Sequence, residues 1–130
     1  MYTVLNPCDM NETFARAFNS RQLEYVLALY EPGSILLPDE SNRVLQGKAE
    51  IGAALEGLLH IPGTLVSRNN FCAQHGDLAL LRADWRLIGP DGNVVVSGSS
   101  AEIVRRQADG RWLYVIDHAA GASRPQVGWE

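Results

Sequence analysis

Apolar residues recur at helical spacing in three segments of the first half of the chain. The first segment runs from Asn6-Pro7 to about Phe18, with Asn6 as the N-cap and Pro7 in the first turn. The second is short and ends at Pro32-Gly33, and the third spans residues 47–59 and ends before Pro62-Gly63. The inward-facing positions are Met10, Phe14, Ala17 and Phe18, then Leu23, Val26, Leu27 and Tyr30, then Ile51, Ala54, Leu55, Leu58 and Leu59.

Strand-like patterns account for most of the remaining chain. Ile35-Leu36-Leu37 predicts a short strand that Pro38-Asp39 closes. Short turns such as Asp109-Gly110 separate four later runs, which favours antiparallel neighbours because a parallel pair needs a long crossover. These runs cover about 64–74, 77–88, 93–107 and 111–118. The order ααβαββββ predicts an α+β fold with helices on one face of a sheet.

Length and charge limit the classes of partner. The chain has 130 residues, which fits one domain, and carries 11 basic and 15 acidic residues for a net charge of −4. No basic stripe points to nucleic acid. The longest apolar run, about residues 25–30, is far shorter than the roughly 20 residues that span a bilayer, and the N-terminus lacks the pattern of a signal peptide. We therefore expect a cytoplasmic protein with neither nucleic acid nor a membrane as partner.

Cysteines and histidines give no sign of a metal or cofactor. Cys8 and Cys72 form no Cys-x-x-Cys pair, and two cysteines are too few for a disulfide framework. We expect reduced, buried thiols, with a catalytic cysteine as the alternative. His60, His75 and His118 lack metal-ligand spacing, and no glycine-rich phosphate loop precedes a helix. The sequence therefore predicts no cofactor and no metal.

Three stretches, in this order and spacing, resemble the nuclear-transport-factor-2-like superfamily, in particular its SnoaL-like and ketosteroid-isomerase-like branch. They are Phe18–Ser20 with Val26–Tyr30, Leu45–Ile51, and Asp109–Leu113 with Asp117-His118. The resemblance covers about residues 8–120 of a single domain 1–130 and leaves a tail at 121–130. It implies a cone-shaped, cystatin-like fold in which a curved antiparallel sheet wraps around helices. The fold alone does not define an activity, because it hosts isomerases, cyclases, hydrolases and non-catalytic modules.

Comparison with the ketosteroid isomerases of this superfamily argues against that reaction. They use a strand carboxylate as base, and a tyrosine plus a protonated acid as oxyanion donors. The resemblance places Phe14 at the tyrosine position, Pro38 at the base with Asp39 one place later, and Glu102 at the donor acid. Phenylalanine cannot donate a proton and proline cannot abstract one, so we expect no ketosteroid isomerase activity. Glu102 is a pocket acid or a solvent-facing strand residue.

Similarity to the epoxide hydrolases and cyclases of this fold implies a different candidate site. Those enzymes use an Arg-x-Asp on a middle strand and an aspartate on the last strand, which here are Arg82, Asp84 and Asp117. Strand alternation puts Arg82 and Asp84 on one face, which is either a catalytic face or a polar outer face. In the last strand, alternation groups Asp117 with Val115 and Leu113, opposite His118 unless a bulge intervenes.

The leading hypothesis is a small-molecule-binding domain with a pocket inside the cone, in a homodimer that forms through the sheet. It includes an isomerase, cyclase or epoxide-hydrolase type of enzyme, and the alternative is a non-catalytic dimerisation or protein-interaction module. The aromatic residues line the pocket or simply fill the core. The candidate pocket residues are Phe14, Phe18, Tyr30, Phe71, Trp85, Glu102 and His118.

Overall fold

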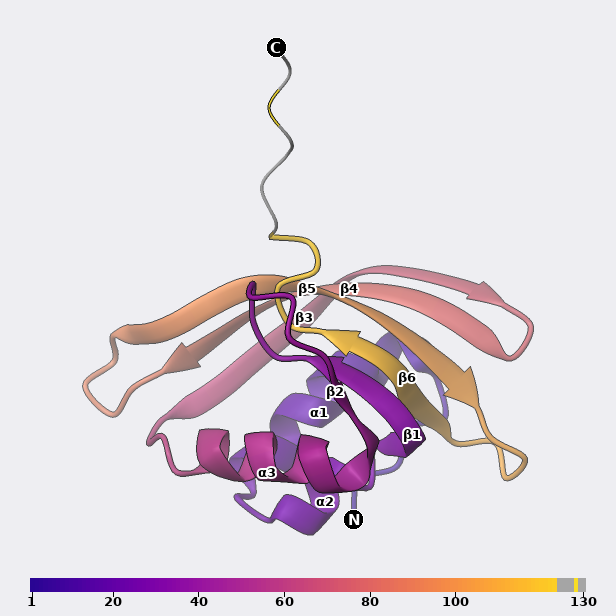
Figure 1. Ribbon diagram of the computed structural model, residues 1–130, viewed down its shortest axis with the longest axis horizontal. Coiled ribbons are helices and arrows are strands. Elements are labelled where there is room, and N and C mark those ends of the chain that lie inside the picture. The colour runs from indigo at the N-terminus through magenta and orange to yellow at the C-terminus, as the bar shows by residue number, and fades with distance from the viewer. Residues whose placement is uncertain (124–127, 129–130) are drawn as a thin grey trace.

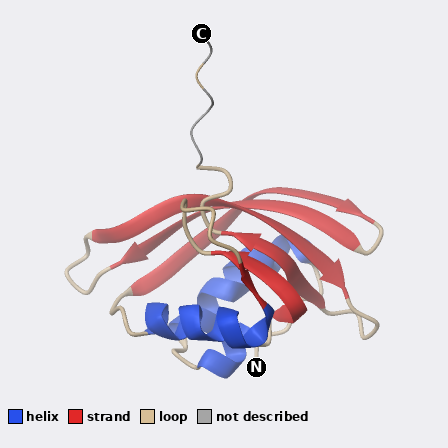
Figure 2. Ribbon diagram, viewed as in Figure 1, coloured by secondary structure: helices blue, strands red, loops and turns tan. Residues whose placement is uncertain are grey.

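A curved sheet of six strands covers a layer of helices packed on its concave face (Figures 1 and 2). The computed structural model describes residues 1–123 and 128. The elements are η1 Pro7–Asp9, α1 Met10–Asn19, α2 Leu23–Leu27, β1 Tyr30–Leu37, β2 Leu45–Gln46, α3 Gly47–Leu59, β3 Thr64–His75, β4 Leu78–Ile88, β5 Val94–Arg106 and β6 Trp112–His118. The predicted α+β class, with a curved sheet on helices, is confirmed.

The strand order in the sheet is β2-β1-β6-β5-β4-β3. The long strands β3, β4 and β5 form antiparallel neighbours through short turns, as the turn signals predict. One pair departs from the antiparallel expectation, because β1 runs parallel to β6, a strand separated from it by most of the chain. The two-residue strand β2 and the 3-10 turn η1 are additions to the predicted order.

The first helical segment starts at the signal Asn6-Pro7 in the sequence. The Asn6 side chain accepts a hydrogen bond from the Cys8 amide at 3.0 Å and starts η1, which continues into α1. The third helix has the predicted bounds.

The second helix is shorter than predicted, and Tyr30 opens β1 instead of ending α2. The Leu29 carbonyl accepts from the Tyr114 amide at 2.8 Å, so pairing with β6 begins at this point and ends the helical segment. Pro32 and Gly33 fall inside β1, where the register with β6 shifts between Tyr30 and Ile35. A proline at such an irregular position removes no ladder hydrogen bond, and Gly33 supplies a φ of +77°.

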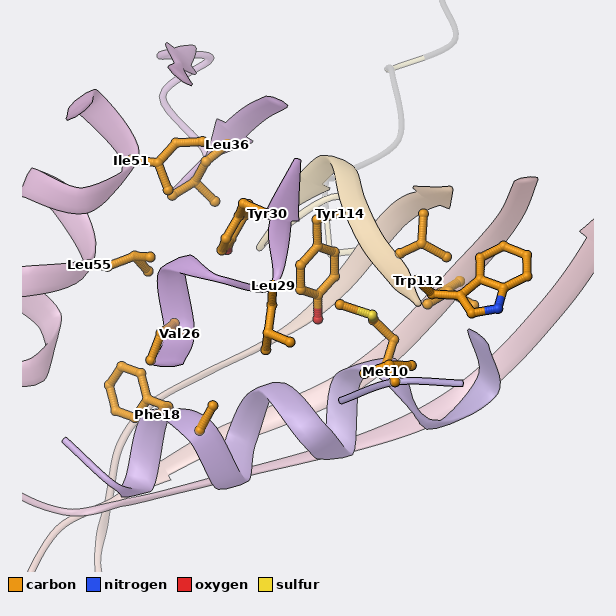
Figure 3. Close-up of a cluster of buried hydrophobic side chains, with 14 of the residues drawn as sticks. Met10, Phe18, Val26, Leu29, Tyr30, Leu36, Ile51, Leu55, Trp112 and Tyr114 are labelled. Carbon is orange, nitrogen blue, oxygen red and sulfur yellow. The ribbon is translucent and has the colours of Figure 1, made fainter. Parts of the chain in front are cut away.

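The hydrophobic core lies between α1, α2 and α3 on one side and β1 and β6 on the other (Figure 3). Met10 and Phe18 come from α1, Ile51 from α3, and Trp112 and Tyr114 from β6, and all are at most 4% exposed. Burial of each such large side chain stabilises the fold by about 1.5–3 kcal/mol. The helical periodicity in the sequence therefore identified the faces that pack on the sheet.

Arg21 fastens the loop after α3 to the end of α1. Its guanidinium donates to the carbonyls of Leu59 at 2.9 Å and Ile61 at 2.8 Å, and also to that of Gly63. Gly63 adopts a φ of +137°, and any Cβ at this position would collide with the Ile88 carbonyl oxygen. The loop therefore requires glycine here for both conformation and space.

The chain turns back onto β5 after β6. The Ala122 amide donates to the Ser99 carbonyl at 3.0 Å, and the Ser123 hydroxyl does so at 3.0 Å. The rest of the predicted tail, at 124–127 and 129–130, lies outside the described residues. Within the part of the chain that the structure describes, no helix has the length and apolar character needed to cross a membrane.

A disulfide joins Cys8 in η1 to Cys72 in β3, with the Cα atoms 5.6 Å apart. The prediction of two reduced thiols is therefore wrong. Sequence spacing could not reveal the pair, because 64 positions separate the two cysteines and only the fold brings them together. The disulfide ties η1, directly before α1, to the sheet. The cytoplasmic location of the protein stays a prediction.

We expect the Cys8→Ser/Cys72→Ser double variant to fold with a free energy of unfolding lower by about 2–4 kcal/mol, because a cross-link across a loop of this length restricts the unfolded chain. Guanidinium chloride denaturation measures the difference. Reduction of the wild type should produce the same loss and should leave the double variant unchanged. Equal stability of all four samples would contradict the structural role of the disulfide.

Candidate functional site

A cavity of about 210 Å³ lies between the concave face of the sheet and the helices α1 and α3. Most of its wall is apolar, and α3 contributes the aliphatic side chains Leu55 and Leu58. Glu102 and Asp117 are the two carboxyl groups in the wall. A largely apolar cavity with a few polar groups is typical of small-molecule sites.

Three aromatic rings in mutual contact form one side of the cavity. Phe14 on α1 lies edge-on to Tyr30 and to Tyr114, with centroid distances of 6.4 and 5.9 Å. The rings of Tyr30 and Tyr114 are 5.1 Å apart, as their paired positions on β1 and β6 require. Phe18 extends this wall one turn further along α1, with its ring stacked 6.3 Å from that of Phe14.

Trp85 on β4 also lines the cavity and is fixed in two ways. Its indole N–H donates to the Ala119 carbonyl at 2.8 Å. Its ring lies over Gly98, the partner residue on β5, where an added Cβ would come within 2.9 Å of the ring. Glycine at position 98 therefore gives the Trp85 ring its space against the strand.

Asn11 holds one of the carboxyl groups in place. Its side-chain amide nitrogen donates to Glu102 Oε1 at 3.1 Å and to Asn69 Oδ1 at 2.8 Å. Its oxygen accepts from the Tyr114 hydroxyl at 2.7 Å, and Figure 3 shows this hydroxyl pointing toward α1. Asn11 is 3% exposed, so one buried amide links the first helix, the edge strand β3, and the central strands β5 and β6.

Asp117 is the second buried carboxyl group, and a bulge in β6 decides its direction. Ile103 pairs with Ile116 and Val104 pairs with Tyr114, so Val115 is an extra residue in β6. The bulge places Tyr114 and Asp117 on the same concave face, whereas simple alternation groups Asp117 with Val115 and is wrong here. The Tyr30 hydroxyl donates to Asp117 Oδ2 at 2.5 Å.

Glu102 and Asp117 occupy directly paired positions on β5 and β6 and are 3% and 8% exposed. Burial raises the pKa of Glu102 to about 8, and the neighbouring Asp117 charge adds to that rise. Burial also raises the pKa of Asp117 to about 6, although the Tyr30 hydrogen bond opposes the rise. Burial likewise raises the pKa values of Tyr30 and Tyr114, which remain hydrogen-bond donors.

The structure brings together most but not all of the predicted site residues. The predicted residues that line the cavity are Phe14, Phe18, Tyr30, Trp85, Glu102 and Asp117. Phe71 does not line the cavity, because a bulge between Asn69 and Phe71 in β3 turns its side chain to the outer face of the sheet. There it is 45% exposed. His118 is outside the lining because it follows Asp117 on the opposite face.

Arg82 and Asp84 are separated from Asp117 by the sheet itself. Both are exposed on the convex face of β4, whereas Ala83 between them is buried on the concave face. Asp84 accepts a hydrogen bond from the Ser99 hydroxyl at 2.7 Å. The prediction that they converge with Asp117 in one pocket is wrong. The sequence left open whether Arg82 and Asp84 lie on a catalytic face or on a polar outer face, and they lie on the polar outer face.

Sequence reasoning missed Asn11 and Tyr114. A signal for Asn11 was present, because it precedes Phe14 by three positions and Phe18 by seven and therefore shares their helix face. No comparable signal marked Tyr114, whose position next to Asp117 depends on the bulge at Val115. Among the described residues, no group of three or more His, Cys, Asp or Glu side chains is arranged to hold a metal ion.

Comparison with known proteins places this geometry in a structural context. A protein from Nostoc punctiforme, of unknown function and with a cystatin-like fold, superposes with a TM-score of 0.72 at 17% identity over 82% of this chain and 81% of that chain. A candidate calcium/calmodulin-dependent protein kinase II association domain from Xanthomonas campestris superposes with a TM-score of 0.68 at 23% identity, over 88% and 83%. A candidate dehydratase of the NTF2-like family from Streptomyces avermitilis gives 0.67 at 16% identity, over 83% and 87%.

These likenesses establish the NTF2-like, cystatin-like fold. The search of curated proteins found no match. The model of the SnoaL-like domain matches residues 11–115, which include Asn11, Glu102 and Tyr114 and end two positions before Asp117. The match covers most of the chain, so this protein belongs to the SnoaL-like domain family.

Proposed function

We propose that the cavity binds a small, mostly apolar molecule and that Asp117 and Glu102 exchange protons with it, as in a cofactor-free isomerase, cyclase or dehydratase. The observation that carries the proposal is the pair of buried carboxyl groups on adjacent strands that faces an apolar cavity. The candidate dehydratase from Streptomyces avermitilis has the same fold, and dehydration requires an acid and a base.

The two carboxyl groups differ in protonation state at neutral pH. Asp117, with a pKa of about 6, is mainly ionised and suits the role of base. Glu102, with a pKa of about 8, is mainly protonated and suits the role of acid. Proton transfer is most effective when the pKa of each group lies near the working pH, and both values meet that condition.

Two further residues act through these carboxyl groups and are positioning residues. Tyr30 donates to Asp117 and fixes one carboxylate oxygen, and Asn11 donates to Glu102 in the same way. Phe14 and Pro38 also line the cavity but contribute neither a proton donor nor a base. We therefore keep the expectation of no ketosteroid isomerase activity.

The alternative function, a dimerisation or interaction module, finds support on the convex face. Phe71 and Leu80 are 45% and 46% exposed there, next to Leu78 at 41%. Exposed apolar side chains on one sheet face favour association. We propose a homodimer through this face, which is compatible with the ligand site because the cavity lies on the concave side.

The proton-transfer proposal can be tested without knowledge of the substrate. We expect the protein to exchange solvent deuterium into the carbon next to the C=O or C=N group in members of a panel of small apolar ketones and cyclic imines in D₂O, followed by proton NMR. Asp117→Asn should remove this exchange, and Glu102→Gln should slow it by about a hundredfold or more. Asp84→Asn on the convex face is the matched control and should exchange like the wild type. If the wild type exchanges deuterium no faster than the Asp117→Asn variant, the proposal is rejected.

Stability should fall as pH rises, because the folded state holds protons on Glu102 and Asp117 that the unfolded state has released. The stabilising effect of those protons is complete below a pH of about 4 and is lost as pH rises through about 6 for Asp117 and about 8 for Glu102. Glu102→Gln should therefore be more stable than the wild type at pH 9, by on the order of 3 kcal/mol. Urea unfolding across this pH range gives the comparison, with the exposed Glu24→Gln as control. Parallel curves for Glu102→Gln and the wild type would contradict the burial of this acid.

The proposed dimer predicts twice the chain mass of 14.3 kDa in light scattering. Leu80→Arg should shift the mass to that of one chain, because it places charge in the apolar part of the convex face. Glu24→Arg on α2, away from the sheet, should leave the dimer intact. A single-chain mass for the wild type at tens of micromolar rejects the dimer but leaves the ligand site untouched.

A further inference from the structure

We infer that the ligand of the cavity carries one cationic nitrogen, an ammonium or iminium group, on an otherwise apolar body. This inference rests on the proposed function only in taking the cavity as the ligand site. Two observations support it independently. Among the described residues, the cavity lining that holds the two carboxyl groups contains no basic side chain, and three aromatic rings form one side of the same space.

Charge is the first observation. The lining residues that the structure describes include Glu102 and Asp117 but no lysine, arginine or histidine. Arg21 lies over the Phe18 ring at 5.1 Å, but its guanidinium is committed to backbone carbonyls after α3. A buried carboxylate without a cation is costly, and a cationic ligand would supply the missing charge.

The aromatic wall is the second observation. Phe14, Tyr30 and Tyr114 meet at centroid distances between 5.1 and 6.4 Å, next to the carboxyl pair. The face of an aromatic ring is negative and attracts cations, most strongly where water is excluded. Clusters of rings together with a carboxylate are suited to ammonium groups, because the rings and the anion attract the same charge.

The arrangement also discriminates against other ligands. A carboxylate or phosphate would meet two acidic groups and no positive partner, so it would be repelled. A neutral ligand would leave the Asp117 charge uncompensated in an apolar cavity. At neutral pH the pair holds about one proton and about one negative charge, which matches a single positive charge on the ligand.

Three soluble probes of similar size separate these cases: benzylamine, benzyl alcohol and benzoate. Their affinities can be measured by calorimetry at pH 7, with the indole signal of Trp85 in the NMR spectrum as a report of binding in the cavity. We expect benzylamine to bind at least about tenfold more tightly than benzyl alcohol, and benzoate to bind more weakly than both. If benzylamine binds no better than benzyl alcohol, or fails to shift the Trp85 signal, the inference is wrong.

Variants assign the effect to the carboxyl pair. Asp117→Asn should remove most of the preference for benzylamine while leaving the affinity for benzyl alcohol nearly unchanged. Asp84→Asn on the convex face should alter neither affinity. Tyr30→Phe keeps the ring and removes the hydroxyl that donates to Asp117, so it should weaken the preference without removing it. Loss of benzylamine binding in Asp84→Asn, or an unchanged preference in Asp117→Asn, would overturn the assignment.

The pH profile gives a further test with a definite sign. The groups that face Asp117 are Tyr30 from β1, Glu102 from β5 and Tyr114 from β6, while Asn11 from α1 reaches Glu102 and α3 presents aliphatic side chains. Affinity for benzylamine should rise with pH through about 6, as Asp117 ionises while the ammonium stays protonated. Affinity for benzyl alcohol should not rise. A flat benzylamine profile contradicts the inference.

These measurements detect binding and not turnover. If amine preference is found and no deuterium exchange occurs, proton transfer fails and the ligand class stands. If exchange occurs on uncharged ketones and benzylamine shows no preference, the ligand class fails and proton transfer stands.

Discussion

The position of Asp117 depends on one extra residue in the last strand, and most of the site follows from it. Val115 has no partner of its own on β5, so the two residues on either side of the bulge, Tyr114 and Asp117, both face the helices. With strict alternation, Asp117 would lie on the convex face and His118 on the concave face. The bulge thus brings a carboxyl group to the position directly opposite Glu102 and beneath the Tyr30 hydroxyl. Bulges are a common means of redirecting a side chain next to a functional site.

Two acidic groups side by side in an apolar cavity are unfavourable unless other elements of the fold supply partners. Here the partners come from α1 and from β1, as Asn11 and Tyr30. Asn11 also reaches Asn69 on β3, three positions before the disulfide at Cys72, so η1 is held to β3 covalently and α1 is held to it by a buried amide. The geometry of the acids and the attachment of α1 to the sheet are therefore parts of one network. The network retains two ionisable groups at a cost in stability, which is typical of functional sites.

Much of the architecture was accessible from the sequence, whereas features that depend on distant pairings were not. The spacing of Met10, Phe14 and Phe18 and the turn at Asp109-Gly110 identified local elements, because local preferences and the final fold agree there. The parallel pairing of β1 with β6 and the disulfide join residues far apart in the chain. The bulge at Val115 lies within the pair of β5 and β6, where no glycine or turn residue marks it in the sequence. Pattern alone could not decide which face of β4 is concave, so Arg82 and Asp84 remained candidates until the sheet curvature was known.

The location of the two acids also limits how a ligand can meet them. In the isomerases that the chain resembles, the base stands on the first strand, where this chain has Pro38. Here the second carboxyl group is on β6, in register with Glu102 on β5, so both acids face the ligand from one wall. The opposite wall, with Leu55 and Leu58 from α3, is aliphatic and offers no polar group. A ligand that uses both acids must therefore present its polar atoms along one edge and its apolar body toward α3. Because adjacent strands lie about 5 Å apart, those polar atoms must also be close neighbours on the ligand.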